Sequence, residues 1–297
     1  MSAAEQACAL IGRFAEPRIA ESAAVAVAAL RRRHFEVLVA AEEPAADRPA
    51  NTTAVPRAQL AARARFMVAV GGDGTLLQAA RLVVGREVPL LGINRGRLGF
   101  LTDVLPQDVA ASIDAVLDER CASDRRPLLE ARLIAAAGPV LRLLALNDVV
   151  LLRRDTGRML DFETSVDGRS VNTHRGDGLV VATATGSTAY ALACGGPIID
   201  PRLNVLVMAP ICPHSLTDRP IVVSGDARIE IRSLDRGLGQ AEVTCDGAPL
   251  GDMKPSDRLE IDTSGGSITL LHPPGYDYFR LLRSKLRWGR GEDRQEA

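Results

Sequence analysis

The chain of 297 residues is long enough for about two domains of ~150 residues, each with its own hydrophobic core. Its formal net charge of −1 excludes a globally basic protein, so no nucleic-acid partner is expected. Its five cysteines show no C-x-x-C spacing, which argues against a disulfide framework or a zinc site and indicates reduced thiols in a cytoplasmic protein.

The first ~120 residues alternate predicted helices and strands. Helical spacing covers 19–33, 76–84 and 106–117, and apolar β-like runs cover 35–39, 66–70 and 88–93. The apolar residues 23–30 are too few to cross a bilayer and arginines follow them, so no membrane partner is expected. Because strands separated by helices favour parallel pairing, residues 1–124 are predicted to form an α/β domain with an open parallel sheet.

The pattern changes after Pro127 to short β-like runs separated by turn pairs such as Asp246 and Gly247. These runs are predicted at 128–135, 140–146, 149–153, 159–166, 179–182, 205–209, 228–232, 242–245, 258–261 and 267–271. They predict a β-rich, largely antiparallel C-terminal domain over residues 125–274. Helical spacing returns at 278–288, within a tail of residues 275–297.

A glycine-rich segment, Gly71-Gly72-Asp73-Gly74-Thr75, follows the apolar run that ends at residue 70. Glycines let a backbone approach a ligand closely, and free N–H groups at a helix start form a phosphate cradle without a lysine. The Asp73 carboxylate would then contact a hydroxyl that attacks the phosphorus atom, or a metal ion beside the phosphate. The alternative is that Asp73 only caps the helix. Neither a complete G-x-G-x-x-G nor a Walker A lysine motif is present.

Residues 92–103 follow the next predicted strand, so their loop is expected at the same sheet edge as Asp73. Arg95 and Arg97 in this loop are candidate counter-charges for phosphate, or else solvated loop charges.

Two further segments offer polar groups to a ligand. Asn147 and Asp148 stand between apolar strands, where they must find partners or face a cleft, and both side chains can hold ribose hydroxyls. The alternative is a β-bulge or a tight turn. The run 182–190 offers small hydroxyl residues and Tyr190 to a flat polar ligand such as adenine, unless it is only a loop that enters a helix. The histidines show no zinc-binding spacing, and we interpret each one as structural or surface-exposed.

Taken together, these segments resemble the bacterial NAD kinase (ATP-NAD kinase) family. The matching segments occur in the family's order and are 71–75, 92–103, 147–151, 177–190, 195–201, 245–247, 271–273 and 276–279. The G-G-D-G segment alone is shared with diacylglycerol-type lipid kinases and phosphofructokinases. The resemblance implies an α/β N-terminal domain, a β-rich C-terminal domain, and a tail that returns to the first domain.

The resemblance also implies a reaction, the transfer of the ATP γ-phosphate to the 2′-hydroxyl of the adenosine ribose of NAD, which gives NADP. Asp73 is then the general base. The implied substrate-binding residues are Gly71, Gly72, Gly74, Thr75, Asn147, Asp148, Arg158, Arg175, Asp177, Thr185, Thr188, Ala189, Tyr190, Ala191, Leu192 and Ala193. Mg²⁺ or another divalent cation would enter with ATP, and polyphosphate stays open as a donor. A homodimer or homotetramer is implied.

This sequence departs from the family pattern at a few positions. Asp148 stands where the family usually has a glutamate, and Gly247-Ala248 offers no glutamine side chain to the adenine. Two other functions stay open. A lipid or sugar kinase shares the glycine-rich loop, although the sequence has no membrane-binding stretch. A nucleotide sensor without catalysis would not need the Asp73 carboxylate.

Overall fold

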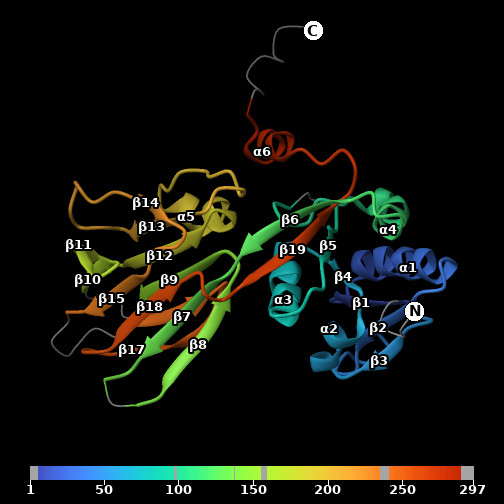
Figure 1. Ribbon diagram of the computed structural model, residues 1–297, viewed down its shortest axis with the longest axis horizontal. Coiled ribbons are helices and arrows are strands. Elements are labelled where there is room, and N and C mark those ends of the chain that lie inside the picture. The colour runs from blue at the N-terminus through green and yellow to red at the C-terminus, as the bar shows by residue number, and fades with distance from the viewer. Residues whose placement is uncertain (1–5, 97–98, 137, 155–158, 235–240, 289–297) are drawn as a thin grey trace, which may run out of the picture. The chain divides into compact units, whose positions relative to one another are not determined.

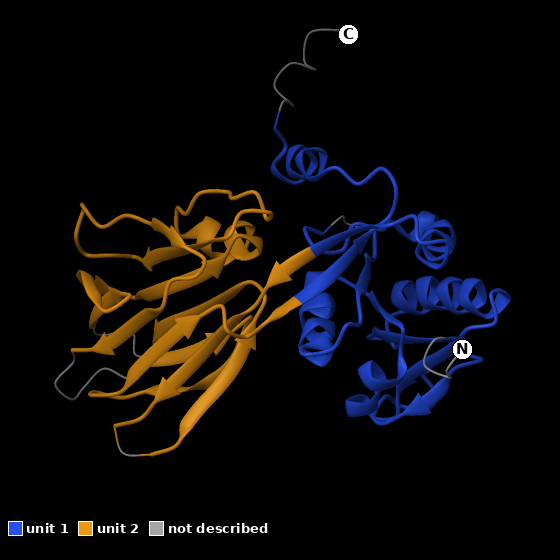
Figure 2. Ribbon diagram, in the orientation of Figure 1, with its two compact units in different colours: residues 1–124, 268–297 blue, residues 125–267 orange. Residues whose placement is uncertain are grey.

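The computed structural model describes residues 6–96, 99–136, 138–154, 159–234 and 241–288 (Figure 1). The chain divides into two compact units, Met1–Asp124 with Ile268–Ala297 as unit 1, and Arg125–Ser267 as unit 2 (Figure 2). Residues 268–274 were expected in the C-terminal domain. They lie in unit 1 because the strand that contains them hydrogen-bonds to a strand of the first sheet.

A seven-stranded sheet forms the centre of unit 1, in the order β3-β2-β1-β4-β5-β19-β6. The strands are β1 (Ala7–Gly12), β2 (Glu36–Ala40), β3 (Thr53–Val55), β4 (Phe66–Val70), β5 (Leu90–Ile93), β6 (Ala122–Pro127) and β19 (Ser267–His272). The pairs β2–β3, β1–β2, β1–β4, β4–β5 and β5–β19 are parallel. The helices are α1 (Pro17–Arg32), α2 (Leu60–Arg63), α3 (Asp73–Val83), α4 (Val109–Leu117) and α6 (Tyr278–Leu286).

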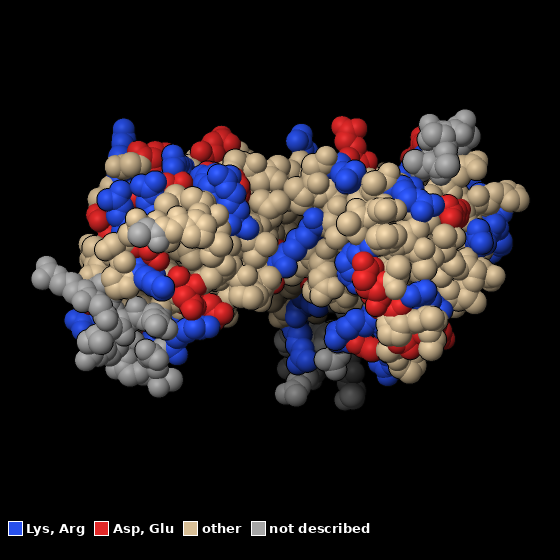
Figure 3. All heavy atoms as spheres, turned by 90° about the horizontal axis from the view of Figure 1, so that it is seen from below, with Lys and Arg blue, Asp and Glu red and all other residues tan. Residues whose placement is uncertain are grey.

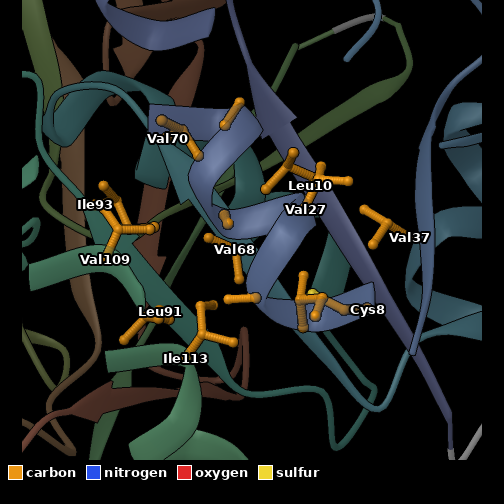
Figure 4. Close-up of a cluster of buried hydrophobic side chains, with 14 of the residues drawn as sticks. Cys8, Leu10, Val27, Val37, Val68, Val70, Leu91, Ile93, Val109 and Ile113 are labelled. Atoms are coloured by element: carbon orange, nitrogen blue, oxygen red, sulfur yellow. The ribbon is translucent and has the colours of Figure 1, made fainter. Parts of the chain in front are cut away.

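One buried cluster joins α1 and α4 to the strands of this sheet (Figure 4). Leu10, Val68 and Leu91 come from β1, β4 and β5, and they pack with Val27 of α1 and Ile113 of α4. The cluster fixes β4 beside β5 in a register that pairs Val70 with Ile93. The loops after these two strands therefore begin at neighbouring points of one sheet edge.

Several details of unit 1 differ from the sequence-based expectation, which contained none of β3, α2 and β6. Strand β1 was not predicted either, yet all six of its residues are buried in the sheet. The helix expected from Leu76 begins at Asp73, because Gly72 is extended and serves as its N-cap residue.

Unit 2 contains two six-stranded sheets, in the orders β11-β10-β15-β18-β7-β8 and β14-β13-β12-β9-β16-β17. Their strands are β7 (Leu129–Ile134), β8 (Val140–Ala145), β9 (Asp148–Arg153), β10 (Leu160–Val166), β11 (Arg169–Gly176), β12 (Gly178–Thr183), β13 (Val205–Ile211), β14 (Ile221–Ser224), β15 (Ile229–Ser233), β16 (Ala241–Cys245), β17 (Ala248–Met253) and β18 (Arg258–Asp262). Every pair with a determined register within unit 2 is antiparallel, for example β9–β12 and β9–β16. Side chains from both sheets form one core, with Phe162 and Ile229 from the first and Val181 and Val243 from the second.

The surface carries both charge signs. Basic and acidic side chains are interspersed on the face shown in Figure 3. Some charged side chains of the surface pair, for example Arg33 Nη2 with Asp118 Oδ1 at 2.8 Å. Within the residues that the structure describes, no helix is long and apolar enough to span a bilayer.

Candidate active site

The Asp73 carboxylate is held by the loop that follows β5. Its Oδ2 accepts a hydrogen bond from the Phe100 N–H at 2.9 Å. Its Oδ1 accepts from the N–H groups of Leu101 and Thr102, both at 3.1 Å, and from the Thr102 hydroxyl at 3.0 Å. The capping alternative is wrong, since Asp73 is the first residue of α3 and its side chain makes no cap hydrogen bond. The carboxylate instead joins the loops after β4 and β5.

The glycines around Asp73 fall into two groups. A Cβ on Gly99 would overlap the Asp73 carboxylate, and a Cβ on Gly71 would overlap the Thr75 hydroxyl, so both positions need the absence of a side chain for packing. The Gly71 N–H donates to the Ile93 carbonyl at 2.8 Å, and Thr75 is buried. A Cβ on Gly72 or Gly74 would meet nothing within 4 Å. Within the loop, these two glycines are therefore the ones that a ligand can approach.

A cavity of about 720 Å³ opens at this loop within unit 1. Asp73, Gly72 and Gly99 line it, together with the charged residues Glu16, Arg18, Arg95 and Lys285. Arg95 Nη1 pairs with Glu16 Oε2 at 2.9 Å. Arg97, the other arginine considered in this loop, lies outside the described residues.

Unit 2 builds a second polar cluster at the start of β9. Asn147 lies in the bend between β8 and β9, which belong to different sheets, and Asp148 begins β9. The Asp246 carboxylate accepts hydrogen bonds from the N–H groups of Leu146, Asn147 and Asp148, at 2.8, 2.8 and 3.2 Å. The side-chain amide of Asn147 makes no hydrogen bond to any described residue, so it is available to a ligand.

Asp148 is a buried carboxyl group beside a second one, with a side chain only 6% exposed. Burial, followed by the negative charge of Asp246, raises the pKa of Asp148 from 3.8 to about 6, although a hydrogen bond from the Tyr190 N–H acts in the opposite direction. Such a group is costly to keep ionised and gains from a ligand that donates hydrogen bonds to it.

The run 185–193 lies close to Asn147 and Asp148. A Cβ on Gly186 would overlap the Asn147 carbonyl, so the two backbones are in close contact. The Thr183 hydroxyl connects the segments, since it donates to the Leu146 carbonyl at 2.7 Å and accepts from the Gly186 N–H at 3.1 Å. The run forms a short 3₁₀ turn (Thr185–Thr188) and the four-residue helix α5 (Tyr190–Ala193).

The members of this run differ in what they can offer a ligand. The Thr185 hydroxyl accepts from Arg126 at 3.1 Å and the residue is buried, as Ala191 is. Tyr190 is 39% exposed, and its ring is accessible to a flat ligand. Partial burial and the nearby Cys194 raise the pKa of the Tyr190 hydroxyl, which therefore stays protonated at neutral pH. Thr188, Ala189 and Leu192 are half-buried, and Ala193 is exposed.

Two of the expected binding residues lie in ion pairs, and one lies outside the described part of the chain. Asp177 Oδ1 lies 2.8 Å from Arg153 Nε. Arg175 is exposed and lies opposite Asp161 on the neighbouring strand, with Nε and Oδ1 3.7 Å apart. Arg158 is not among the described residues.

Asp246 and His272 support the site through contacts that no local sequence pattern indicates. Asp246 was expected in a turn and in the family-like segment 245–247. Its carboxylate organises the Asn147 and Asp148 backbone, and its left-handed conformation, with φ of 46°, fits the turn that places it there. His272 was interpreted as structural or surface-exposed, and the structure shows it buried, with Nδ1 2.7 Å from Asp103 and its ring stacked on Tyr276 at 3.7 Å. Asp103 ends the loop that binds Asp73, so this buried pair anchors that loop to β19.

Comparison with known proteins agrees with this arrangement. The model of the ATP-NAD kinase N-terminal domain matches residues 16–121, and that of the ATP-NAD kinase C-terminal domain matches residues 146–272. These two models define the class, a two-domain kinase with a glycine-rich loop in its first domain.

Relatives and solved structures identify the family. A protein named NAD kinase from Nitrosococcus oceani is 42% identical over 281 residues, 95% of this chain and 96% of that protein. One from Methylococcus capsulatus is 44% identical over 283 residues, 94% of this chain and 96% of that protein. Accordingly, the chain belongs to the NAD kinase family.

Two solved structures share the fold. Yeast NADH kinase complexed with NADH gives a TM-score of 0.89 at 25% identity, over 98% of this chain and 90% of that chain. An NAD kinase from Archaeoglobus fulgidus in complex with ATP gives a TM-score of 0.73 at 29% identity, over 95% of this chain and 98% of that chain. The expected two-domain fold, α/β followed by a β-rich domain, is thereby confirmed.

Proposed function

We propose that this protein transfers the γ-phosphate of ATP to the 2′-hydroxyl of the adenosine ribose of NAD and so makes NADP. The observation that carries the proposal is the Asp73 carboxylate, held by four hydrogen bonds in a charged cavity of a chain that matches NAD kinases over nearly its whole length. The NADH and ATP complexes of the two similar structures support the choice of acceptor and donor.

On the donor side, the phosphates of ATP occupy the cavity at Gly72, close to the exposed Gly74. These glycines leave room for phosphate oxygens, and the start of α3 favours negative charge. Phosphoryl transfer depends mainly on positioning and on charge stabilisation, which backbone N–H groups and the cavity cations supply. Polyphosphate, which offers the same oxygens, is the second candidate donor.

On the acceptor side, Asn147 and Asp148 bind the ribose hydroxyls of NAD. The unoccupied Asn147 amide and the poorly hydrated Asp148 carboxylate both gain from hydroxyl partners. Tyr190 stacks on the adenine, and the other members of the run 185–193, with Arg175, Asp177 and Arg158, shape the pocket.

Asp73 is the general base that accepts the proton of the 2′-hydroxyl. Its Oδ1 accepts three hydrogen bonds and its Oδ2 one from the described residues, so Oδ2 is the oxygen with room for a hydroxyl donor. A base in this position is worth about 10²–10⁴-fold in rate.

Mg²⁺ enters with ATP. The residues fit this mode of binding, since Mg²⁺ commonly takes one or two protein carboxylates together with phosphate oxygens. In the cavity Glu16 is paired with Arg13 and Arg95 and Asp73 accepts from loop donors, so phosphate oxygens and water would supply most ligands of the cation. Within the described ranges, no group of three or more His, Cys, Asp or Glu side chains is placed to hold a metal. Bound Mg²⁺ would supply charge neutralisation on the phosphates.

We also propose that the protein works in the cytoplasm as a homodimer or homotetramer. The unpaired state of its cysteines supports a reducing compartment.

The direct test is incubation of the purified protein with NAD, ATP and Mg²⁺, followed by enzymatic detection of NADP. Parallel reactions supply diacylglycerol or a sugar phosphate as the acceptor. NADP formation supports the proposal. Phosphorylation of a lipid or sugar without NADP would overturn it in favour of the other kinase classes, and nucleotide binding without any transfer would favour a sensor.

A further inference from the structure

Helix α6 brings a lysine to the cavity at Asp73. Lys285 lines this cavity, and its Nζ lies 5.6 Å from the centroid of the Phe100 ring, within the range of a cation–π contact. Phe100 is also the residue whose N–H donates to Asp73 Oδ2. One loop residue thus contacts both the lysine and the carboxylate.

The orientation of Lys285 follows from the way α6 is built. Asp277 caps the helix by accepting from the N–H groups of Phe279 and Arg280, at 2.8 and 3.1 Å. Leu281 is buried, and it lies one turn before Lys285 on the same helix face. Burial of Leu281 therefore places Lys285 on the side of α6 that borders the cavity, where the residue is exposed.

The charges that line the cavity do not cancel one another. Arg95 is paired with Glu16, and Asp73 is occupied by N–H and hydroxyl donors. Among the described residues, no carboxylate forms an ion pair with Lys285 or with Arg18. Two cations that form no ion pair with a described residue, beside the open backbone of Gly72, favour an anionic ligand with several charged oxygens.

We propose that Lys285 binds a phosphate group of the donor nucleotide, as a lysine supplied to the glycine-rich loop from the far end of the chain. That this donor is ATP rests on the proposed function. That the ligand carries several phosphate oxygens is inferred from the charges of the cavity itself. An ammonium group is a compact charge that binds non-bridging phosphate oxygens through several hydrogen bonds.

The amino-acid composition allows an unusually direct test, because Lys285 and Lys254 are the only lysines in the sequence. Lys254 is an exposed residue of unit 2 and serves as an internal control. The protein is treated with limiting N-hydroxysuccinimidyl acetate, and the acetylation of each lysine is measured by peptide mass spectrometry. The reaction is run in buffer, in inorganic triphosphate, in Mg-ATP, and in sodium chloride of matched ionic strength.

We expect triphosphate and Mg-ATP to slow the acetylation of Lys285 at least fivefold, with Lys254 unaffected and sodium chloride without effect. Equal acetylation of Lys285 in all four conditions would overturn the proposal. This readout needs no NAD and no turnover, so it distinguishes the two claims. Protection without NADP formation would refute the proposed function and leave the phosphate contact standing.

Kinetics supply the second readout. Lys285→Gln should raise the KM for ATP about tenfold and leave the KM for NAD unchanged, since one charged contact to the donor is lost. Lys285→Arg should recover most of the affinity, and Lys254→Gln should behave like the wild type. An unchanged KM for ATP in Lys285→Gln, or an equal rise of both KM values, would contradict a specific contact with the donor.

Discussion

The buried carboxyl pair of unit 2 makes a prediction in which stability and activity change in opposite directions. Asp148→Asn keeps an oxygen that can accept from the Tyr190 N–H, keeps the size of the side chain, and removes the charge that Asp246 repels. The variant should therefore be more stable than the wild type at neutral and alkaline pH.

The size of the effect follows from the pKa of Asp148, which rises from 3.8 to about 6 on folding. A shift of about two units corresponds to about 3 kcal/mol. Because the pKa is higher in the folded state, that state binds more protons between these values, and stability is lost as the pH rises from about 4 to about 6. The Asn variant does not titrate, so its advantage should be about 3 kcal/mol at pH 8 and should vanish at pH 4.

The assay is urea unfolding at pH 4, 5, 6 and 8, with the free energies of the wild type and the variant compared at each pH. Asp246→Asn is the matched control. It should destabilise unit 2 at pH 8 by about 1–3 kcal/mol. The reason is that the new NH₂ group would face one of the three N–H groups that donate hydrogen bonds to the Asp246 carboxylate. A destabilised Asp148→Asn at pH 8, or an advantage independent of pH, would refute the reasoning. The Asp148→Asn variant should also make NADP much more slowly, because the carboxylate that destabilises the fold is the group proposed to bind NAD.

Three further predictions concern the other parts of the site. Asn147→Ala should weaken the use of NAD roughly 5- to 150-fold and leave the use of ATP nearly unchanged, and steady-state kinetics with both substrates check this. Gly99→Ala should reduce NADP formation at least ~10²-fold with the protein still folded by circular dichroism, because its Cβ would displace the Asp73 carboxylate; wild-type activity would show that the loop can shift at no cost. Dialysis against a chelator should abolish activity without unfolding the protein, and added Mg²⁺ should restore it, whereas unfolding under chelation would indicate a structural metal.

The elements that carry strong local signals were predictable from the sequence. The apolar run 66–70 before the glycines indicated a buried parallel strand, and β4 is found there with parallel neighbours on both sides. Strands β11 and β17 escaped prediction, although each pairs with the strand just before it in the chain, because both lie at sheet edges and few of their residues are buried. The composition of such strands does not reveal them.

In the site, too, the residues were predictable from local sequence and their long-range contacts were not. The sequence indicated Asp73, Asn147 and Asp148 because polar side chains beside buried apolar strands must either find hydrogen-bond partners or face a cleft. The contact of Asp73 with Phe100, Leu101 and Thr102 joins residues 27 to 29 positions apart, and no local pattern indicates such a pairing. His272 likewise meets Asp103, 169 positions away, only after β19 has joined the first sheet.

The central claim, that Asp73 is the general base, needs a variant series that separates proton transfer from loop positioning. Asp73→Asn removes the proton acceptor and also places an amide group against an N–H donor of the loop. Thr102→Val loosens the same loop by removing one hydroxyl bond and keeps the carboxylate intact.

The decisive measurement is kcat for NADP formation at saturating NAD and Mg-ATP in the wild type, Asp73→Asn and Thr102→Val. A general base predicts a loss of at least ~10²-fold for Asp73→Asn that added Mg²⁺ does not restore, and a loss below ~10-fold for Thr102→Val. An Asp73→Asn variant within about threefold of the wild-type kcat, or equal losses in the two variants, would contradict the assignment.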